Sequence, residues 1–214
     1  MGDTVWIFDG LGNEIDARIV QINSRSTELS LGERRRAPAE RGAAGLTLLQ
    51  GLARGEKMDV VIQKTTELGV QRIVPVLMNR SVVRATESGG GGRLRRWRAI
   101  AEQAARQSGR AAVPEIAAPQ KLEDALRVVD SGSLRFALWE QVVGRSLRVA
   151  LAAAAPEQPI ALLVGPEGGL TTGEVEMVVA AGFDAVGLGP RILRTETAAI
   201  VAVALAQAAR GALD

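Results

Sequence analysis

From Leu46 onward, short apolar segments alternate with segments of helical spacing, and this order restricts the chain to a few folds. Leu46–Leu52 (LTLLQGL), Arg72–Met78 (RIVPVLM) and Pro159–Gly165 (PIALLVG) are continuous apolar runs, and Glu56–Gly69 between the first two has helical spacing. Runs without polar alternation are typical of parallel strands that are buried on both faces. The order therefore predicts an α/β fold with a mostly parallel sheet.

The first 45 residues have a different pattern. Val5–Asp9, Ile15–Asn23 and Thr27–Leu31 are strand-like and are joined by glycine-containing turns, as in an antiparallel meander or small barrel. We interpret the charged stretch Glu33–Gly42 as a linker rather than as an RNA contact. Two regions are expected, a β region over residues 1–42 and an α/β domain over residues 45–214.

Composition narrows the possible chemistry. The chain contains no Cys and no His, which excludes disulfides, Cys nucleophiles and the usual zinc sites. Any acid–base step must use a carboxylate, Lys, Arg, the backbone or water, because the commonest general base is missing. No apolar run reaches about 18 residues and no signal peptide is recognisable, so we expect a cytoplasmic protein with no membrane contact and no metal.

Positive charge is concentrated in the middle of the chain. Residues 46–110 carry 12 basic and 5 acidic side chains, net +7, although the net charge of the whole chain is only +2. Such a cluster attracts polyanions, including nucleic acids. The alternative is that individual arginines simply solvate helix faces.

Three strand ends carry the candidate site residues. Leu138–Glu140, Val164–Gly169 (VGPEGG) and Leu188–Glu196 (LGPRILRTE) each follow an apolar run, and ligands of open α/β sheets bind beyond the carboxyl ends of the strands. The glycines leave backbone groups open to a ligand. A tight turn with a surface Glu167 is the alternative interpretation of the second loop.

The third loop leads into the last predicted helix. Thr195 is placed to cap that helix, with Glu196 in its first turn, while Arg194 is placed to reach a ligand or a phosphate. An ion pair between Arg194 and Glu167 is the structural alternative. Neither a P-loop nor a G-x-G-x-x-G fingerprint occurs, which disfavours a nucleotide triphosphatase and a Rossmann-type oxidoreductase.

GPEGG and LGPRILRTETA, together with Met58–Val83 and Arg96–Ile116, resemble the SPOUT methyltransferases that act on ribosomal RNA. More narrowly, these motifs are similar to the bacterial enzymes that methylate N3 of a uridine in 16S ribosomal RNA. The resemblance implies a C-terminal trefoil knot and a homodimer formed through the knot region. It also implies that the helix Thr195–Ala209 packs at the dimer interface. The apolar face of this helix, Ala199, Val203 and Ala206, suits close packing of helices, and it equally suits an ordinary buried helix. Family members begin with a complete PUA-like β-barrel, and here residues 1–42 are expected to form only part of one.

The resemblance also assigns site residues. S-adenosyl-L-methionine would be bound by Leu138, Glu140, Leu163, Val164, Gly165, Pro166, Glu167, Gly168, Leu188, Gly189, Ile192, Leu193 and Thr195. Arg194 is the first catalytic candidate, because its cation would stabilise negative charge on the uracil or a phosphate, and Glu196 is a weaker one. The RNA of the small ribosomal subunit would be contacted by Arg80, Arg84, Arg106 and Arg110. Arg110 ranks first among these because it ends the QSGR motif.

Two alternatives stay open. The chain is also compatible with another SPOUT enzyme that methylates transfer RNA or a different ribosomal RNA position. It is compatible, too, with a non-catalytic RNA-binding module whose loops are structural.

Overall fold

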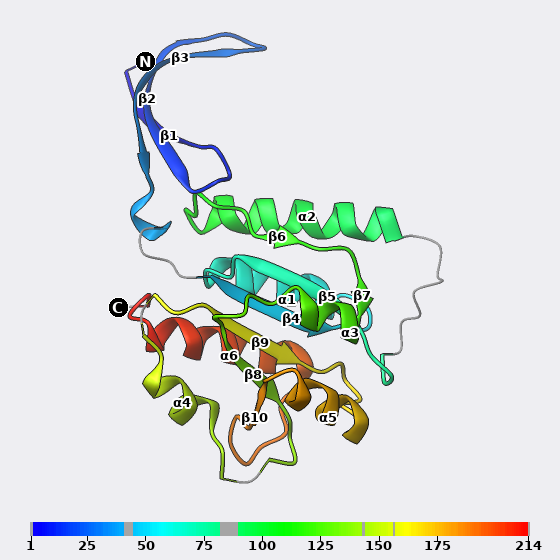
Figure 1. Cartoon of the computed structure of the whole chain (residues 1–214). Helices are drawn as coiled ribbons and strands as arrows, with labels where there is room; N and C mark the ends of the chain where they lie inside the picture. Colours follow the sequence, from blue (N-terminus) through cyan, green and yellow to red (C-terminus); the bar gives the residue numbers. More distant parts are fainter. Residues whose placement is uncertain (1, 41–44, 82–89, 143, 156, 214) are drawn as a thin grey trace.

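The computed structural model describes residues 2–40, 45–81, 90–142, 144–155 and 157–213, and in these segments the chain forms two separate sheets (Figure 1). The first sheet is antiparallel, in the order β1 (Thr4–Phe8), β2 (Asn13–Ile22) and β3 (Thr27–Arg36). The second is parallel, as the apolar runs predict. Its order is β10 (Asp184–Val186), β8 (Leu134–Leu138), β9 (Ile160–Val164), β4 (Leu46–Gly51), β5 (Arg72–Leu77) and β6 (Glu115–Ile116), with β7 (Gln120–Lys121) also beside β5.

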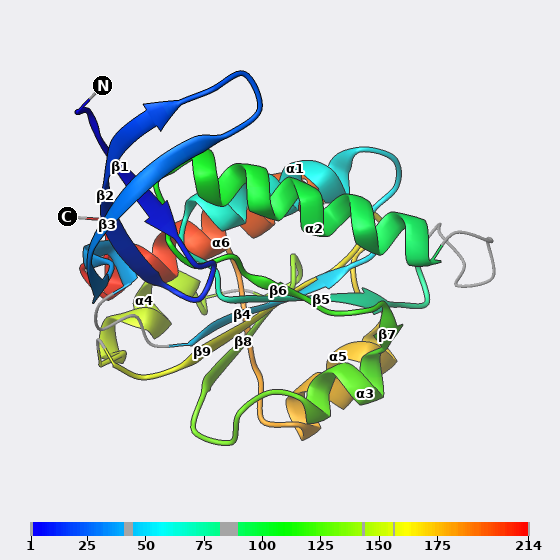
Figure 2. The ribbon, with the colours of Figure 1, turned by 90° about the horizontal axis from the view of Figure 1, so that it is seen from above.

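Helices cover both faces of the parallel sheet (Figure 2). One face carries α1 (Lys57–Glu67), α2 (Gly90–Gln107), α4 (Leu147–Ala150) with the short 3-10 turn η2 (Leu151–Ala153), and α6 (Thr195–Ala209). The other face carries α3 (Leu122–Arg127) and α5 (Thr172–Ala180). Two apolar clusters result, one on each face, and the central strands are buried between them.

The last helix belongs to the core of its own chain. Ala199, Val203 and Ala206 are fully buried in the cluster with α1 and the central strands. Of the two interpretations of these three side chains, the ordinary buried helix is confirmed, because they already pack inside one chain. Small side chains at this spacing let α6 lie close to the sheet.

The third N-terminal strand is longer than expected. Glu33–Arg36 continues β3, with Arg35 opposite Glu14 and Arg34 opposite Ile15, and a 3-10 turn η1 (Pro38–Glu40) follows. The linker interpretation is wrong for Glu33–Arg36, which pairs with β2 and includes a cross-strand ion pair between Arg35 and Glu14 at 2.8 Å. Residues 41–42 of the same predicted linker lie outside the described residues.

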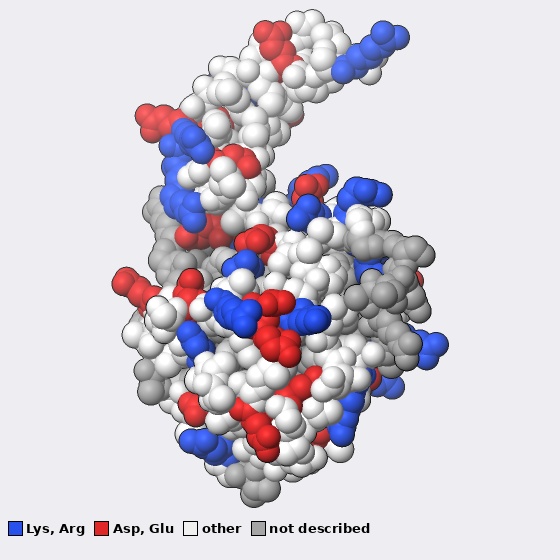
Figure 3. Space-filling model, turned by 45° about the vertical axis from the view of Figure 1, so that its right-hand side comes forward, with Lys and Arg blue, Asp and Glu red and all other residues white. Residues whose placement is uncertain are grey.

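The antiparallel sheet projects from the molecule, and we call residues 2–36 the N-terminal arm. In Figure 3 it stands clear of the rounded α/β body and carries both acidic and basic side chains. Apolar side chains such as Trp6, Val20, Ile22 and Leu31 are exposed on it. No helix in the described part of the chain is long and apolar enough to cross a membrane.

Candidate functional site

A cavity of about 710 Å³ lies at the carboxyl ends of β8, β9 and β10, where the sequence predicts a ligand site. It is lined by all three predicted segments, which confirms that the two glycine-containing loops form one pocket. The lining residues are Lys57, Leu138–Glu140, Val164–Gly169, Val186–Thr195 and Ala198.

Thr195 joins the two loops through buried hydrogen bonds. Its hydroxyl donates to the carbonyl oxygen of Gly165 at 2.6 Å and accepts from Nε2 of Gln50 at 2.9 Å. The predicted helix cap is wrong: Arg194 is the N-cap residue of α6 and makes no side-chain capping bond. Thr195 instead ties the start of α6 to the loop after β9, and both segments line the pocket.

Glycine is required where backbones approach closely behind the pocket. A Cβ atom on Gly51, the last residue of β4, would lie 2.5 Å from the nitrogen of Pro166. A Cβ atom on Gly168 would lie 2.8 Å from Cβ of Arg80, whose guanidinium donates to the Gly168 carbonyl at 2.8 Å. The GPEGG loop is therefore held from two sides, by β4 and by the segment after β5.

Glu167 points toward the start of α1 rather than toward Arg194. Its carboxylate accepts from the amide of Arg54 at 2.9 Å and pairs with Nζ of Lys57 at 3.0 Å. Partial burial acts to raise the pKa of Glu167, but the hydrogen bonds from the Arg54 and Glu167 amides and the charge of Lys57 outweigh it and lower the pKa. The alternative of an Arg194–Glu167 ion pair is wrong.

The loop after β10 offers unused hydrogen-bond donors. The amides of Gly189, Arg191, Ile192 and Leu193 have no hydrogen-bond partner in the described segments. Gly189 adopts φ of +105°, a conformation that favours glycine. A row of open amides beside glycines suits a polar ligand that is recognised through the backbone.

Two predicted residues lie outside this pocket. Leu163 is fully buried in the apolar cluster with α3 and α5, whereas its neighbour Val164 lines the pocket, because alternate residues of β9 point to opposite faces of the sheet. Glu196 is half-buried and does not line the cavity. The other predicted ligand-binding residues and Arg194 all line it.

The sequence-based analysis missed several lining residues. Trp139, Gly169, Pro190 and Arg191 lie within the predicted segments, although they were not assigned individually. Lys57, Val186, Gly187 and Ala198 lie outside those segments, and only Val186 and Gly187 could have been found from their position at the end of an apolar run.

The four arginines predicted to bind RNA lie in different environments. Arg80 is exposed beside the GPEGG loop, and Arg106 is exposed on α2. Arg84 lies outside the described residues. Arg110 is only 6% exposed, and its guanidinium is bonded to Glu40 and to two carbonyl groups. The prediction that Arg110 contacts RNA is wrong, because the chain itself already occupies the guanidinium.

No group of three or more acidic, His or Cys side chains that could hold a metal is present among the residues the structure describes. The pocket is lined by backbone groups, by the carboxylates of Glu140 and Glu167, and by cationic side chains at its rim. Arg191 and Arg194 are exposed there.

Comparison with known proteins identifies what this arrangement resembles. A family model described as an RNA methyltransferase domain matches residues 40–207. Ribosomal RNA small subunit methyltransferase E of Bacillus subtilis is 34% identical over 160 residues, or 73% of this chain and 62% of that protein. The protein of that name from Mycobacterium tuberculosis is 31% identical over 206 residues, or 94% of this chain and 77% of that one.

Solved structures agree over most of the chain. The ribosomal RNA small subunit methyltransferase E from Neisseria gonorrhoeae, bound to S-adenosyl methionine, superposes with a TM-score of 0.82 at 33% identity, covering 97% of this chain and 83% of that one. A putative methyltransferase from Legionella pneumophila, in complex with the same cofactor, gives 0.83 at 30% identity, covering 97% and 84%.

Proposed function

This chain belongs to the RNA methyltransferase domain family, and on that premise we propose that it methylates N3 of a uridine in the ribosomal RNA of the small subunit. The methyl donor in this proposal is S-adenosylmethionine. The observation that carries the proposal is the single pocket formed by two glycine-containing loops, closed by Thr195 and bordered by Arg194.

The pocket residues fit this donor. The amides of Gly189, Arg191, Ile192 and Leu193 donate to no other group in the described residues, and they are free to donate to the adenine or the carboxylate. Trp139 lines the pocket, and its Nε1 is buried without a partner in the described residues. When bound, the cofactor supplies an electrophilic methyl group on a sulfonium, and the protein supplies position and electrostatics.

Arg194 is the residue we assign to charge stabilisation. It lies at the rim of the pocket, is exposed, and has no ion-pair partner among the described residues. A guanidinium beside a uracil oxygen favours the anionic form of the base, in which N3 is nucleophilic. Lys57 already pairs with Glu167, so its cation is partly neutralised. Glu196 has no catalytic part in this proposal, because it does not line the cavity.

Three further features belong to the proposal. The loop from Leu188 to Leu193 is proposed to thread through a trefoil knot. A second copy of the chain is proposed to complete the site, and Ile192, 87% exposed at the pocket, offers an apolar contact for it. Residues 1–42 are proposed to be a PUA-like region and, together with the exposed Arg80 and Arg106, to contact the RNA.

A methyl-transfer assay on purified 30S particles and on free 16S RNA tests the function, with mass mapping of the modified nucleotide. Arg194→Ala should lower kcat about 10²- to 10³-fold, as expected for loss of a group that stabilises developing charge. The affinity for the cofactor should be unchanged. Arg148→Ala, on the exposed side of α4, is the matched control and should keep full activity.

Methyl transfer only to transfer RNA, or to another atom of the base, would contradict the substrate assignment. The absence of any calorimetric signal with S-adenosylmethionine would instead favour a non-catalytic RNA-binding module.

A further inference from the structure

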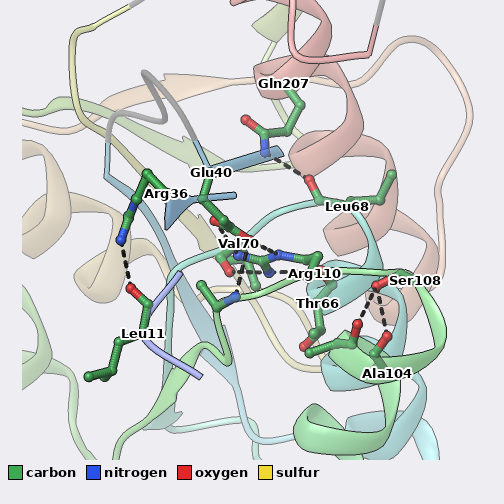
Figure 4. A network of polar contacts seen from close by, with 12 residues as sticks. Leu11, Arg36, Glu40, Thr66, Leu68, Val70, Ala104, Ser108, Arg110 and Gln207 are labelled. Carbon is green, nitrogen blue, oxygen red and sulfur yellow. Dashed lines mark hydrogen bonds and ion pairs between the residues drawn. The ribbon is translucent and has the colours of Figure 1, made fainter. Parts of the chain in front are cut away.

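A buried ion pair joins the N-terminal segment to the α/β body (Figure 4). Nε of Arg110 lies 3.1 Å from Oε1 of Glu40, and the two residues are 6% and 5% exposed. Nη1 of Arg110 donates to the carbonyl oxygens of Thr66 and Val70, both at 2.8 Å. The guanidinium is thus held by one carboxylate from the N-terminal segment and by two backbone carbonyl groups at the end of α1.

The same pair fixes the point where the N-terminal arm meets the body. The amide of Ala112 donates to Oε1 of Glu40 at 3.3 Å. Beside it, the amide of Gly12 donates to the Ala111 carbonyl and that of Val113 to the Gly10 carbonyl, both at 3.0 Å. Leu11 and Ala112 therefore face each other as a short antiparallel bridge.

Away from this point the arm has little support. Strands β1, β2 and β3 contact one another extensively, but in the described residues none of them packs substantially against a helix or strand of the body. The ten residues of β2 extend about 33 Å at the usual rise per residue. A small rotation at the base of the arm is therefore amplified into a displacement of several ångströms at its tip.

The body side of this joint is held in place by further hydrogen bonds. Thr66 and Val70 flank the end of α1, and Nε2 of Gln207 in α6 donates to the Leu68 carbonyl at 2.8 Å. These contacts lie at the amino ends of the parallel strands, whereas the pocket lies at their carboxyl ends. A change at the joint consequently alters the direction of the arm without touching the pocket.

We propose that Arg110 and Glu40 are positioning residues, which hold the N-terminal arm in the one direction that lets a folded RNA contact the arm and enter the pocket together. This inference rests on the proposed function. The pair acts on the substrate through the arm, since neither side chain is accessible to RNA. Two linked contacts raise affinity only while their geometry allows simultaneous binding.

Kinetic analysis of Glu40→Gln and Arg110→Lys tests the inference. Each variant removes part of the joint while keeping side-chain size nearly constant. KM for the 30S particle should rise about tenfold, because the linked contacts lose effective concentration. The kcat, the cofactor affinity and the KM for a short RNA that reaches only the pocket should be unchanged. Glu67→Gln, which removes the partly exposed Lys64–Glu67 pair on α1, is the matched control and should change none of these values.

A disulfide lock provides the second test, since the natural chain has no cysteine. Leu11 and Ala112 form a non-hydrogen-bonded antiparallel pair, whose Cα spacing of about 4.5 Å suits a disulfide. Leu11→Cys with Ala112→Cys is added to either joint variant. The oxidised disulfide should return KM for the 30S particle to the value of the unaltered chain, and reduction should raise KM again.

An unchanged 30S KM in both joint variants would overturn the inference. It would also be overturned if cofactor affinity or the short-RNA KM changed in parallel, or if the oxidised lock failed to restore KM, because the pair would then be merely structural. If the unaltered protein methylates no RNA, the proposed function fails instead. Small-angle scattering of the same variants, with and without the lock, then decides whether the pair sets the direction of the arm.

Discussion

Arginine side chains lie in opposite environments at the two ends of the parallel strands. At the carboxyl edge, Arg191 and Arg194 are exposed beside a cavity, next to backbone amides that have no partner in the described residues. At the amino edge, Arg110 is buried and bonded to Glu40, Thr66 and Val70. At the carboxyl ends of the strands, hydrogen-bond donors are left available to a ligand. At the amino ends, the donors of Arg110 are used within the chain, where they hold the N-terminal segment to the α/β body.

Arg110→Ala should have the largest effect on folding stability. It leaves the Glu40 carboxylate buried without a counter-charge, which typically costs about 3–5 kcal/mol. Urea denaturation followed by circular dichroism measures the loss. Arg106→Ala, four residues away on the exposed face of α2, should change the free energy of unfolding by less than about 0.5 kcal/mol. An equal loss of unfolding free energy in the two variants would show that the buried Arg110 does not hold the two regions together.

Thr195→Val should have an intermediate effect. The substitution keeps the shape of the side chain but leaves the Gly165 carbonyl and Nε2 of Gln50 without this partner, at a cost of about 1–3 kcal/mol. Cofactor affinity, measured by calorimetry, should fall as well, because the two loops are no longer tied. Thr172→Val on the exposed first turn of α5 is the control. A stable variant with full cofactor affinity would show that the hydroxyl is not what joins the loops.

Glu167 should contribute a small, pH-dependent stability. Its pKa is lower in the folded chain than in the unfolded chain, so its contribution is present above the unfolded pKa and is lost as pH falls through the folded pKa. The pair with Lys57 is partly exposed, so the contribution should be less than about 1 kcal/mol. The difference in unfolding free energy between the unaltered chain and Glu167→Gln should shrink below about pH 4.5. A difference that grows on acidification would contradict the assigned direction.

Arg194→Ala should have the smallest effect on stability, within about 0.5 kcal/mol, because the side chain is exposed and forms no ion pair in the described residues. Its thermal midpoint should match that of the unaltered chain, while kcat for methyl transfer falls about 10²- to 10³-fold. A large drop in the midpoint would mean that Arg194 supports the loop instead of serving the reaction.

Much of the parallel-sheet domain could be predicted from the sequence. The apolar runs gave the strands because both faces of a covered parallel sheet are buried, and the glycine-rich loops lay at strand ends as expected. Leu163 was misplaced because a run that is apolar on both faces does not reveal which residue points to which face. Lys57 was missed because only the close approach of β4 to the GPEGG loop brings the start of α1 to the pocket.

The joint could not be predicted, for a different physical reason. Glu40 and Arg110 are 70 residues apart, and each occurs in a stretch whose charge suggests exposure. Burial of a charged side chain depends on a partner, and one sequence does not identify that partner. The same limit explains why Glu33–Arg36 was interpreted as a linker, although cross-strand pairing makes it part of β3.

The hydrogen bond between Thr195 and Gly165 affects when the pocket can form during synthesis on the ribosome. Because chains emerge from the amino end and tend to fold as they emerge, β4, β5 and β9 are available well before α6. The pocket stays incomplete until α6 has been made, since Thr195 is needed to close it. The methyl donor would therefore bind only to chains in which α6 has already been synthesised. Shorter nascent chains would not be stabilised against unfolding by that ligand.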